Sequence, residues 1–125
     1  PAPPARKPKG LSSCGCGAGA GIAYLLGGDY RAIAHTIVNA VAILSGTICD
    51  GAKPSCAAKI ASAVEAGILG YYMYVHDQQF RGGDGIVAKG VENTIRNVGL
   101  LASHGMKQTD RVILNIMTGK TQDNC

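Results

Sequence analysis

The distribution of proline constrains the fold of this chain more than any other feature of its sequence. Four of the five prolines fall within residues 1–8, and after Gly10 the only proline is Pro54. Small, helix-compatible residues dominate the region after Gly10, and almost no segment alternates polar and apolar side chains as a half-buried strand would. We therefore predict an all-α fold, namely a compact bundle of about five helices with a cysteine-bearing loop.

The chain is expected to form one domain with two short ends. With 125 residues, of which 46% are hydrophobic and 16% charged, it can build one modest core. Residues 1–10 have no periodic apolar pattern that would offset the entropy of ordering them, so they are predicted to be a disordered Pro- and Lys-rich tail or a remnant of cloning. Residues 11–119 are predicted to be the helical domain, and residues 120–125 a polar C-terminal tail.

Local signals place the helix boundaries. The first helix should follow Ser12-Ser13 and stop at Gly27-Gly28, and the second should begin after Asp29, which is a good N-cap. The third follows a loop over residues 46–55, and the last begins at Thr109 or Asp110. Apolar periodicity predicts a buried face in the second helix, formed by Ile33, Ile37, Val41 and Leu44. It also gives one apolar stripe in the third helix, at Ala57, Ala61, Val64, Ile68 and Tyr72, and one in the fourth, at Val91, Ile95, Val98 and Ala102. Alanine and glycine fill much of the rest of the third helix, and these small residues permit close approach of another helix.

Charge and cysteine content argue against several classes of protein. The net charge of +4 owes much to Arg6, Lys7 and Lys9, and no aromatic-laced basic face follows them, so no nucleic-acid binding is expected. Five cysteines are an odd number, and no cleavable hydrophobic leader precedes them, which favours a reducing cytoplasm over a secreted disulfide framework. The most apolar run, residues 60–75, contains Glu65 and falls short of the roughly 20 apolar residues that a membrane-spanning helix needs.

The cysteines before two predicted helices are the most informative polar residues. Ser55 would cap the third helix and place Cys56 in its first turn, near unpaired N–H groups and the positive end of the helix dipole, where a thiolate is favoured. Cys14 repeats this arrangement at the start of the first helix. Together with Cys49 in the intervening loop, these thiols could surround one anionic cluster.

Spacing alone leaves other interpretations open. The pattern is neither CxxC nor a ferredoxin run, and a free cysteine usually behaves as a small buried hydrophobe. A disulfide between Cys49 and Cys56 is disfavoured by the expected compartment. Lys53 in the loop could bind a substrate carboxylate or simply be solvated, and His35, beside the apolar stripe of the second helix, could transfer protons or simply be packed.

Four stretches cover nearly everything after the tail: Leu11-Ser-Ser-Cys14, Cys49-Asp-Gly-Ala-Lys-Pro-Ser-Cys56, Asp84-Gly-Ile-Val-Ala-Lys-Gly-Val-Glu-Asn-Thr-Ile-Arg-Asn97 and Gln108-Thr-Asp-Arg-Val-Ile-Leu-Asn-Ile-Met117. Together and in this order, they resemble the C-terminal part of the iron–sulfur-dependent L-serine dehydratase α-chain and L-cysteine desulfidase family, most closely its cysteine desulfidase branch.

The resemblance implies a cofactor and a reaction. Cys14, Cys49 and Cys56 match the ligands of a [4Fe–4S] cluster, Cys125 matches a C-terminal cysteine that is a ligand in the serine dehydratase branch, and Cys16 has no counterpart. The implied enzyme is a lyase that eliminates hydrogen sulfide from L-cysteine, or water from L-serine, and gives pyruvate and ammonia. Lys53 would then be the candidate substrate-binding residue.

The resemblance also implies that the chain acts with other parts. Family members are several times longer, and their upstream part supplies a further cysteine, a substrate loop and a domain that covers the cluster. We therefore expect a separate chain that supplies this part, within a homo- or hetero-oligomer. Two other hypotheses stay open for the lone chain: a non-catalytic helical interaction domain or degenerate copy without a cluster, and a zinc or redox thiol site.

Overall fold

The fold consists of helices joined by turns and one longer connection. The computed structural model describes residues 10–45, 47 and 54–119. The described residues contain no strand, which confirms the predicted all-α class. Their helices are α1 (Gly10–Leu25), α2 (Tyr30–Leu44), α3 (Pro54–Val75), α4 (Val91–Leu100), the π-helical turn η1 (Leu101–Gly105) and α5 (Met106–Met117).

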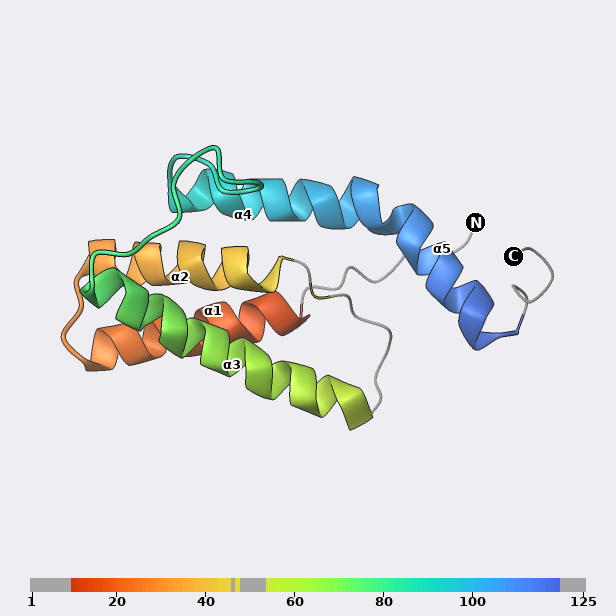
Figure 1. The fold of residues 1–125 in the computed structure, drawn as a ribbon, viewed down its shortest axis with the longest axis horizontal. Coiled ribbons are helices and arrows are strands. Elements are labelled where there is room, and N and C mark those ends of the chain that lie inside the picture. Colours follow the sequence, from red (N-terminus) through yellow and green to blue (C-terminus); the bar gives the residue numbers. More distant parts are fainter. Residues whose placement is uncertain (1–9, 46, 48–53, 120–125) are drawn as a thin grey trace.

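Helices α1, α2 and α3 form a three-helix bundle in which every pair is in contact. Figure 1 shows that α1 and α3 run in the same direction and that α2 runs in the opposite one. Helix α4 packs against α2 on the side away from the other two, and α5 extends beyond the bundle (Figure 1). Within the described part of the chain, no helix is long and apolar enough to cross a membrane.

The turn between α1 and α2 agrees with the sequence prediction. Gly27 has a φ of +83°, and the backbone N–H of Gly28 donates to the carbonyl of Ala23 at 2.8 Å, so the chain leaves the helix in a left-handed conformation that glycine adopts readily. Asp29 then caps α2, because its side chain accepts a hydrogen bond from the N–H of Ala32 at 3.0 Å. At the other end of α1, the helix begins at Gly10, before the predicted Ser12-Ser13.

Small residues bring α1 and α3 close together. Gly15 lies against the backbone of Ala63, and a Cβ added at Gly19 would lie 2.8 Å from the Cα of Gly67. The two helices therefore touch through their backbones, and only glycine and alanine fit between them.

The predicted buried stripes are only partly correct. In α2, Val41 and Leu44 are buried but Ile33 and Ile37 are half-buried. In α3, Val64 and Ile68 of the stripe are half-buried, but Ala57, Ala61 and Tyr72 are exposed. The residues that α3 buries are Ala63, Ala66, Gly67 and Gly70. The physical reason is the close approach of the helices, which leaves no room for larger side chains at the contact.

The stripe predicted for α4 is not buried either. Ile95 is 50% exposed, and Val91, Val98 and Ala102 are half-buried. Thr94 is the buried residue of this helix, because its hydroxyl binds the backbone that precedes α4. Hydrogen bonds of Thr94 therefore hold α4 in place, whereas the apolar pattern predicted hydrophobic contacts.

The last two predicted helices are joined. In the described residues α4, η1 and α5 follow one another without a break, so the chain forms four separate helical rods instead of about five. Helix α5 begins at Met106 instead of Thr109 or Asp110. A π-helical turn keeps the backbone helical while changing its course, and Figure 1 shows a bend at this point.

Candidate functional site

Helices α1 and α3, which contain the candidate ligands Cys14 and Cys56, start at the same end of the bundle, the end at which α2 finishes (Figure 1). Their register follows from the glycine contacts, since Gly15 lies against Ala63 and Gly19 against Gly67. Cys14 immediately precedes Gly15, and Cys56 lies seven residues before Ala63. At 1.5 Å per helical residue, Cys56 therefore lies about 9 Å further toward that end than Cys14.

Cys56 lies in the first turn of α3, as the sequence predicted. Its thiol is free and half-buried. The helix begins at Pro54 instead of after a Ser55 cap, because proline is favoured at the first helical position, where its missing N–H removes no hydrogen bond. Cys14, in contrast, is the fifth residue of α1 and lies in its second turn, since α1 begins earlier than predicted.

The remaining candidate residues lie outside the described part of the chain. Cys49 and Lys53 belong to the segment of sequence that connects α2 to α3, and Cys125 is the last residue. Of the candidate ligands, only Cys56 has its side chain among the described residues. Within that part of the chain, no group of three or more His, Cys, Asp or Glu side chains comes together.

Cys16 is a packed thiol of α1 that lies beside α2. Its Sγ donates a weak hydrogen bond to the carbonyl of Ile37 in α2, with 3.9 Å between the sulfur and the oxygen. Burial raises the pKa of Cys16 to about 11, since the thiolate is poorly solvated there. The thiol therefore stays protonated at neutral pH and is a poor metal ligand.

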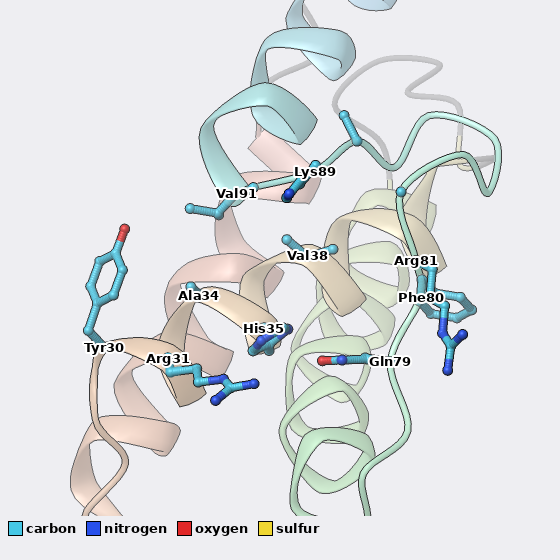
Figure 2. Close-up of a pocket in the computed structure, with 13 residues that line it drawn as sticks. Tyr30, Arg31, Ala34, His35, Val38, Gln79, Phe80, Arg81, Lys89 and Val91 are labelled. Atoms are coloured by element: carbon cyan, nitrogen blue, oxygen red, sulfur yellow. The ribbon is translucent and has the colours of Figure 1, made fainter.

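A cavity of about 590 Å³ lies beside the opposite end of α2, away from the candidate cysteines. Its walls are the first half of α2, residues 79–82 and residues 88–91 at the start of α4. The wall includes Arg31, Arg81 and Lys89, and its apolar part includes Val38 and Phe80 (Figure 2).

Sequence reasoning missed this cavity, because its residues come from three separate stretches that share no periodic pattern. Of the wall residues, only His35 was a candidate for a chemical role in the sequence analysis. The His35 ring stacks on Tyr74 of α3, with 5.3 Å between the ring centroids and 14° between the planes. His35 is thus a packed residue of the cavity wall.

Comparison with known proteins identifies the family. Residues 10–115 match the sequence profile of the family described as serine dehydratase alpha chain. The chain belongs to this family. The match covers most of the chain and includes Cys14, Cys49 and Cys56, whereas Cys125 lies beyond it.

Several curated relatives of this serine dehydratase α-chain member are much longer. A UPF0597 protein of Desulfitobacterium hafniense is 71% identical over 108 residues, which are 86% of this chain and 25% of the relative. A UPF0597 protein of Finegoldia magna is 52% identical over 111 residues, or 89% of this chain and 27% of the relative. A UPF0597 protein of Bacteroides fragilis is 42% identical over 112 residues, which are 86% of this chain and 26% of the relative.

The chain therefore spans about a quarter of the length of these relatives. Their names do not separate the cysteine desulfidase branch from the serine dehydratase branch. No solved structure matches the chain significantly.

Proposed function

We propose that this chain is the cluster-binding part of a lyase that eliminates hydrogen sulfide from L-cysteine, or water from L-serine, to give pyruvate and ammonia. The observation that carries the proposal is the common end of the bundle at which α1 and α3 begin, with Cys14 in one helix and Cys56 in the other. In the sequence, Cys49 lies between the last residue of α2 and the first residue of α3. Membership of the serine dehydratase α-chain family supports the same function.

The donor set fits a [4Fe–4S] cluster. Such clusters are held by cysteine thiolates, and Cys14, Cys49 and Cys56 would hold this one, with Cys125 as the candidate for a further ligand. Cys56 lies in the first turn of α3, where backbone N–H groups lack helical acceptors.

The residues of this chain would hold the cluster and orient the substrate. When bound, the cluster supplies a Lewis-acidic iron at which the substituent on the β-carbon can leave. Lys53, between Cys49 and Cys56 in the sequence, would bind the substrate carboxylate with its ammonium group. We favour L-cysteine over L-serine because a thiolate leaving group has a high affinity for iron.

The proposal also includes a partner for α5. Among the described helical elements, α5 contacts only η1, and none of its residues is buried. One side of α5 is apolar, and the other carries Lys107, Gln108, Arg111 and Asn115. On the apolar side three large side chains are 49–61% exposed, namely Val112, Ile116 and Met117.

An amphipathic helix with this much exposed apolar surface is typical of an interface. We assign its occupant to the part of the family protein that this chain lacks, which is about three quarters of the relatives' length. This part would lie on a separate chain or elsewhere in a longer one, and would complete the site in a homo- or hetero-oligomer.

Anaerobic iron–sulfur reconstitution tests the cluster. We expect a brown protein with absorption in the sulfur-to-iron charge-transfer region, and loss of this absorption in the Cys14→Ala, Cys49→Ala and Cys56→Ala variants. Cys16→Ala is the matched control and should keep it, because Cys16 faces α2. Absence of the chromophore from the unmodified protein would refute the cluster, and zinc bound in its place through the same cysteines would favour the zinc-site hypothesis.

Complementation tests the partner. The upstream part of the Desulfitobacterium hafniense relative is mixed with the reconstituted chain, and sulfide release from L-cysteine and pyruvate formation from L-serine are measured. We expect complex formation that Ile116→Asp and Met117→Asp abolish and that Arg111→Ala, on the polar side, preserves. A colourless chain that still binds this part through α5 would be an interaction domain without lyase chemistry.

A further inference from the structure

The cavity between α2 and α4 has an unusual charge. Three of its wall residues carry a permanent positive charge, namely Arg31 in α2, Arg81 in the connection before α4, and Lys89 next to α4, and the wall contains no Asp or Glu. None of the three forms an ion pair with any residue that the structure describes. All three side chains are exposed, and together they give this hollow a positive potential that attracts anions.

The N-terminus of α4 adds to this positive potential. Gly90 is the N-cap residue, with a φ of +93°, and no side chain caps the helix. Gly90 and Val91 both line the cavity, so the unpaired N–H groups of the first turn lie next to it. Glu92, the acidic residue of this turn, is not part of the wall.

Buried polar side chains fix the walls. Asn39, which is fully buried, donates from Nδ2 to the carbonyl of Gly70 at 3.1 Å, and its Oδ1 accepts from the N–H of Phe80 at 3.3 Å. Thr94, also fully buried, accepts from the N–H of Ala88 at 3.1 Å through its hydroxyl oxygen. These bonds hold residues 79–82 and 88–90 in place, so the cavity is largely formed before any ligand enters.

The shape of the cavity indicates the kind of anion. Figure 2 shows the Lys89 amine above Val38 on one side of the hollow and the Arg31 guanidinium beside His35 on another, with Arg81 at the rim. Val38 and Phe80 supply apolar surface near these charges. The volume of about 590 Å³ lies within the range of about 300–1,000 Å³ that is usual for small-molecule sites.

We propose that this cavity binds a small organic carboxylate with a short apolar chain. The carboxylate is held by Arg31, Lys89 and the N-terminus of α4, and the apolar chain lies against Val38 and Phe80. The site lies at the other end of α2 from the candidate cysteines and is therefore distinct from the proposed elimination site. Its existence does not depend on a cluster or on lyase activity.

Titration followed by backbone amide NMR tests this site on the full chain. The probes are sodium butyrate, sodium phosphate as an anion without an apolar chain, and 1-butanol as a chain without a charge. We expect butyrate to shift the amide signals of Gly90 and Val91 saturably, and more tightly than phosphate, while butanol leaves them unchanged.

Variants then assign the contacts. Because each change removes a charged hydrogen-bond donor of the carboxylate, Arg31→Gln and Lys89→Gln should each weaken butyrate binding about tenfold. Both side chains are exposed, so the fold should survive, and the same spectra verify it. Arg96→Gln, in α4 but outside the wall, is the control and should bind as the unmodified protein does.

Three outcomes would overturn the proposal. The first is no saturable shift with butyrate, and the second is equal loss of affinity in the Arg96→Gln control. The third is tighter binding of phosphate than of butyrate, which would mean that the site prefers a phosphate ligand to a carboxylate.

Discussion

Replacing Gly19 by alanine tests the contact that sets the register of α1 against α3. A Cβ at this position would lie 2.8 Å from the Cα of Gly67 and 2.9 Å from its carbonyl oxygen, and these backbone atoms cannot rotate away. Carbon atoms in contact prefer separations of about 3.5–4.0 Å, so the helices would have to move apart by roughly 1 Å. Gly21 in the same helix is the matched control, because a Cβ there would meet nothing within 4 Å.

The two substitutions should differ in their effect on stability. Gly21→Ala should raise the free energy of unfolding by about 1 kcal/mol, which is the difference in helix propensity between alanine and glycine. Gly19→Ala gains the same term but overpacks the contact, which typically costs about 1–3 kcal/mol. We therefore expect Gly19→Ala to be about 1–3 kcal/mol less stable than Gly21→Ala, a difference of roughly 5 °C or more in melting temperature.

Urea unfolding followed by far-UV circular dichroism measures both variants beside the unmodified chain. Equal stability of the two variants would refute the close packing of α1 on α3. It would also remove the main support for placing Cys14 and Cys56 at a common end, since their register rests on this contact.

Contacts of Asn39, Thr94 and Cys16 lead to further predictions. Asn39→Leu should lower the free energy of unfolding in urea by about 2–4 kcal/mol, because it leaves the Gly70 carbonyl and the Phe80 N–H without their partner, whereas no loss would mean that neither group is buried. Thr94→Val should cost about 1–3 kcal/mol in the same assay, and a neutral result would contradict its role as an anchor of α4. Because burial raises the pKa of Cys16 from 9.0 to about 11, its alkylation by iodoacetamide at pH 8 should be slower in the folded chain than in urea, and equal rates would show that it is not buried. The stabilisation from keeping this thiol neutral is present below pH 9 and is lost as the pH rises toward 11, so stability should fall less over that range in Cys16→Ala.

The features that follow from local chemistry were predictable from the sequence. Asp29 caps α2 because a short acceptor side chain can reach the free N–H groups of the first turn, and glycine at position 27 ends α1 because it can adopt positive φ. Both effects involve residues only a few positions apart. Sequence alone therefore placed this turn correctly.

Most features that depend on tertiary contacts were not predictable, although the alanine and glycine of α3 did indicate close approach of another helix. Apolar periodicity is judged mainly from large apolar residues such as Tyr72. The residues that α3 buries include Ala63 and Gly67, which have a small side chain or none. No pattern within the sequence of α1 or of α3 indicates that the two helices run parallel and begin at the same end of the bundle. The α2–α4 cavity likewise combines residues as distant in sequence as Arg31 and Lys89.

The π-helical turn η1 has a geometric consequence for α5. A π turn holds one more residue than an α turn would, and each residue of an α-helix turns the chain by about 100°. The apolar side of α5 is therefore rotated by about that angle from where an unbroken α-helix would put it. Deleting one residue from η1 would redirect this side while leaving the sequences of α4 and α5 intact, so η1 sets the direction from which a partner can approach α5.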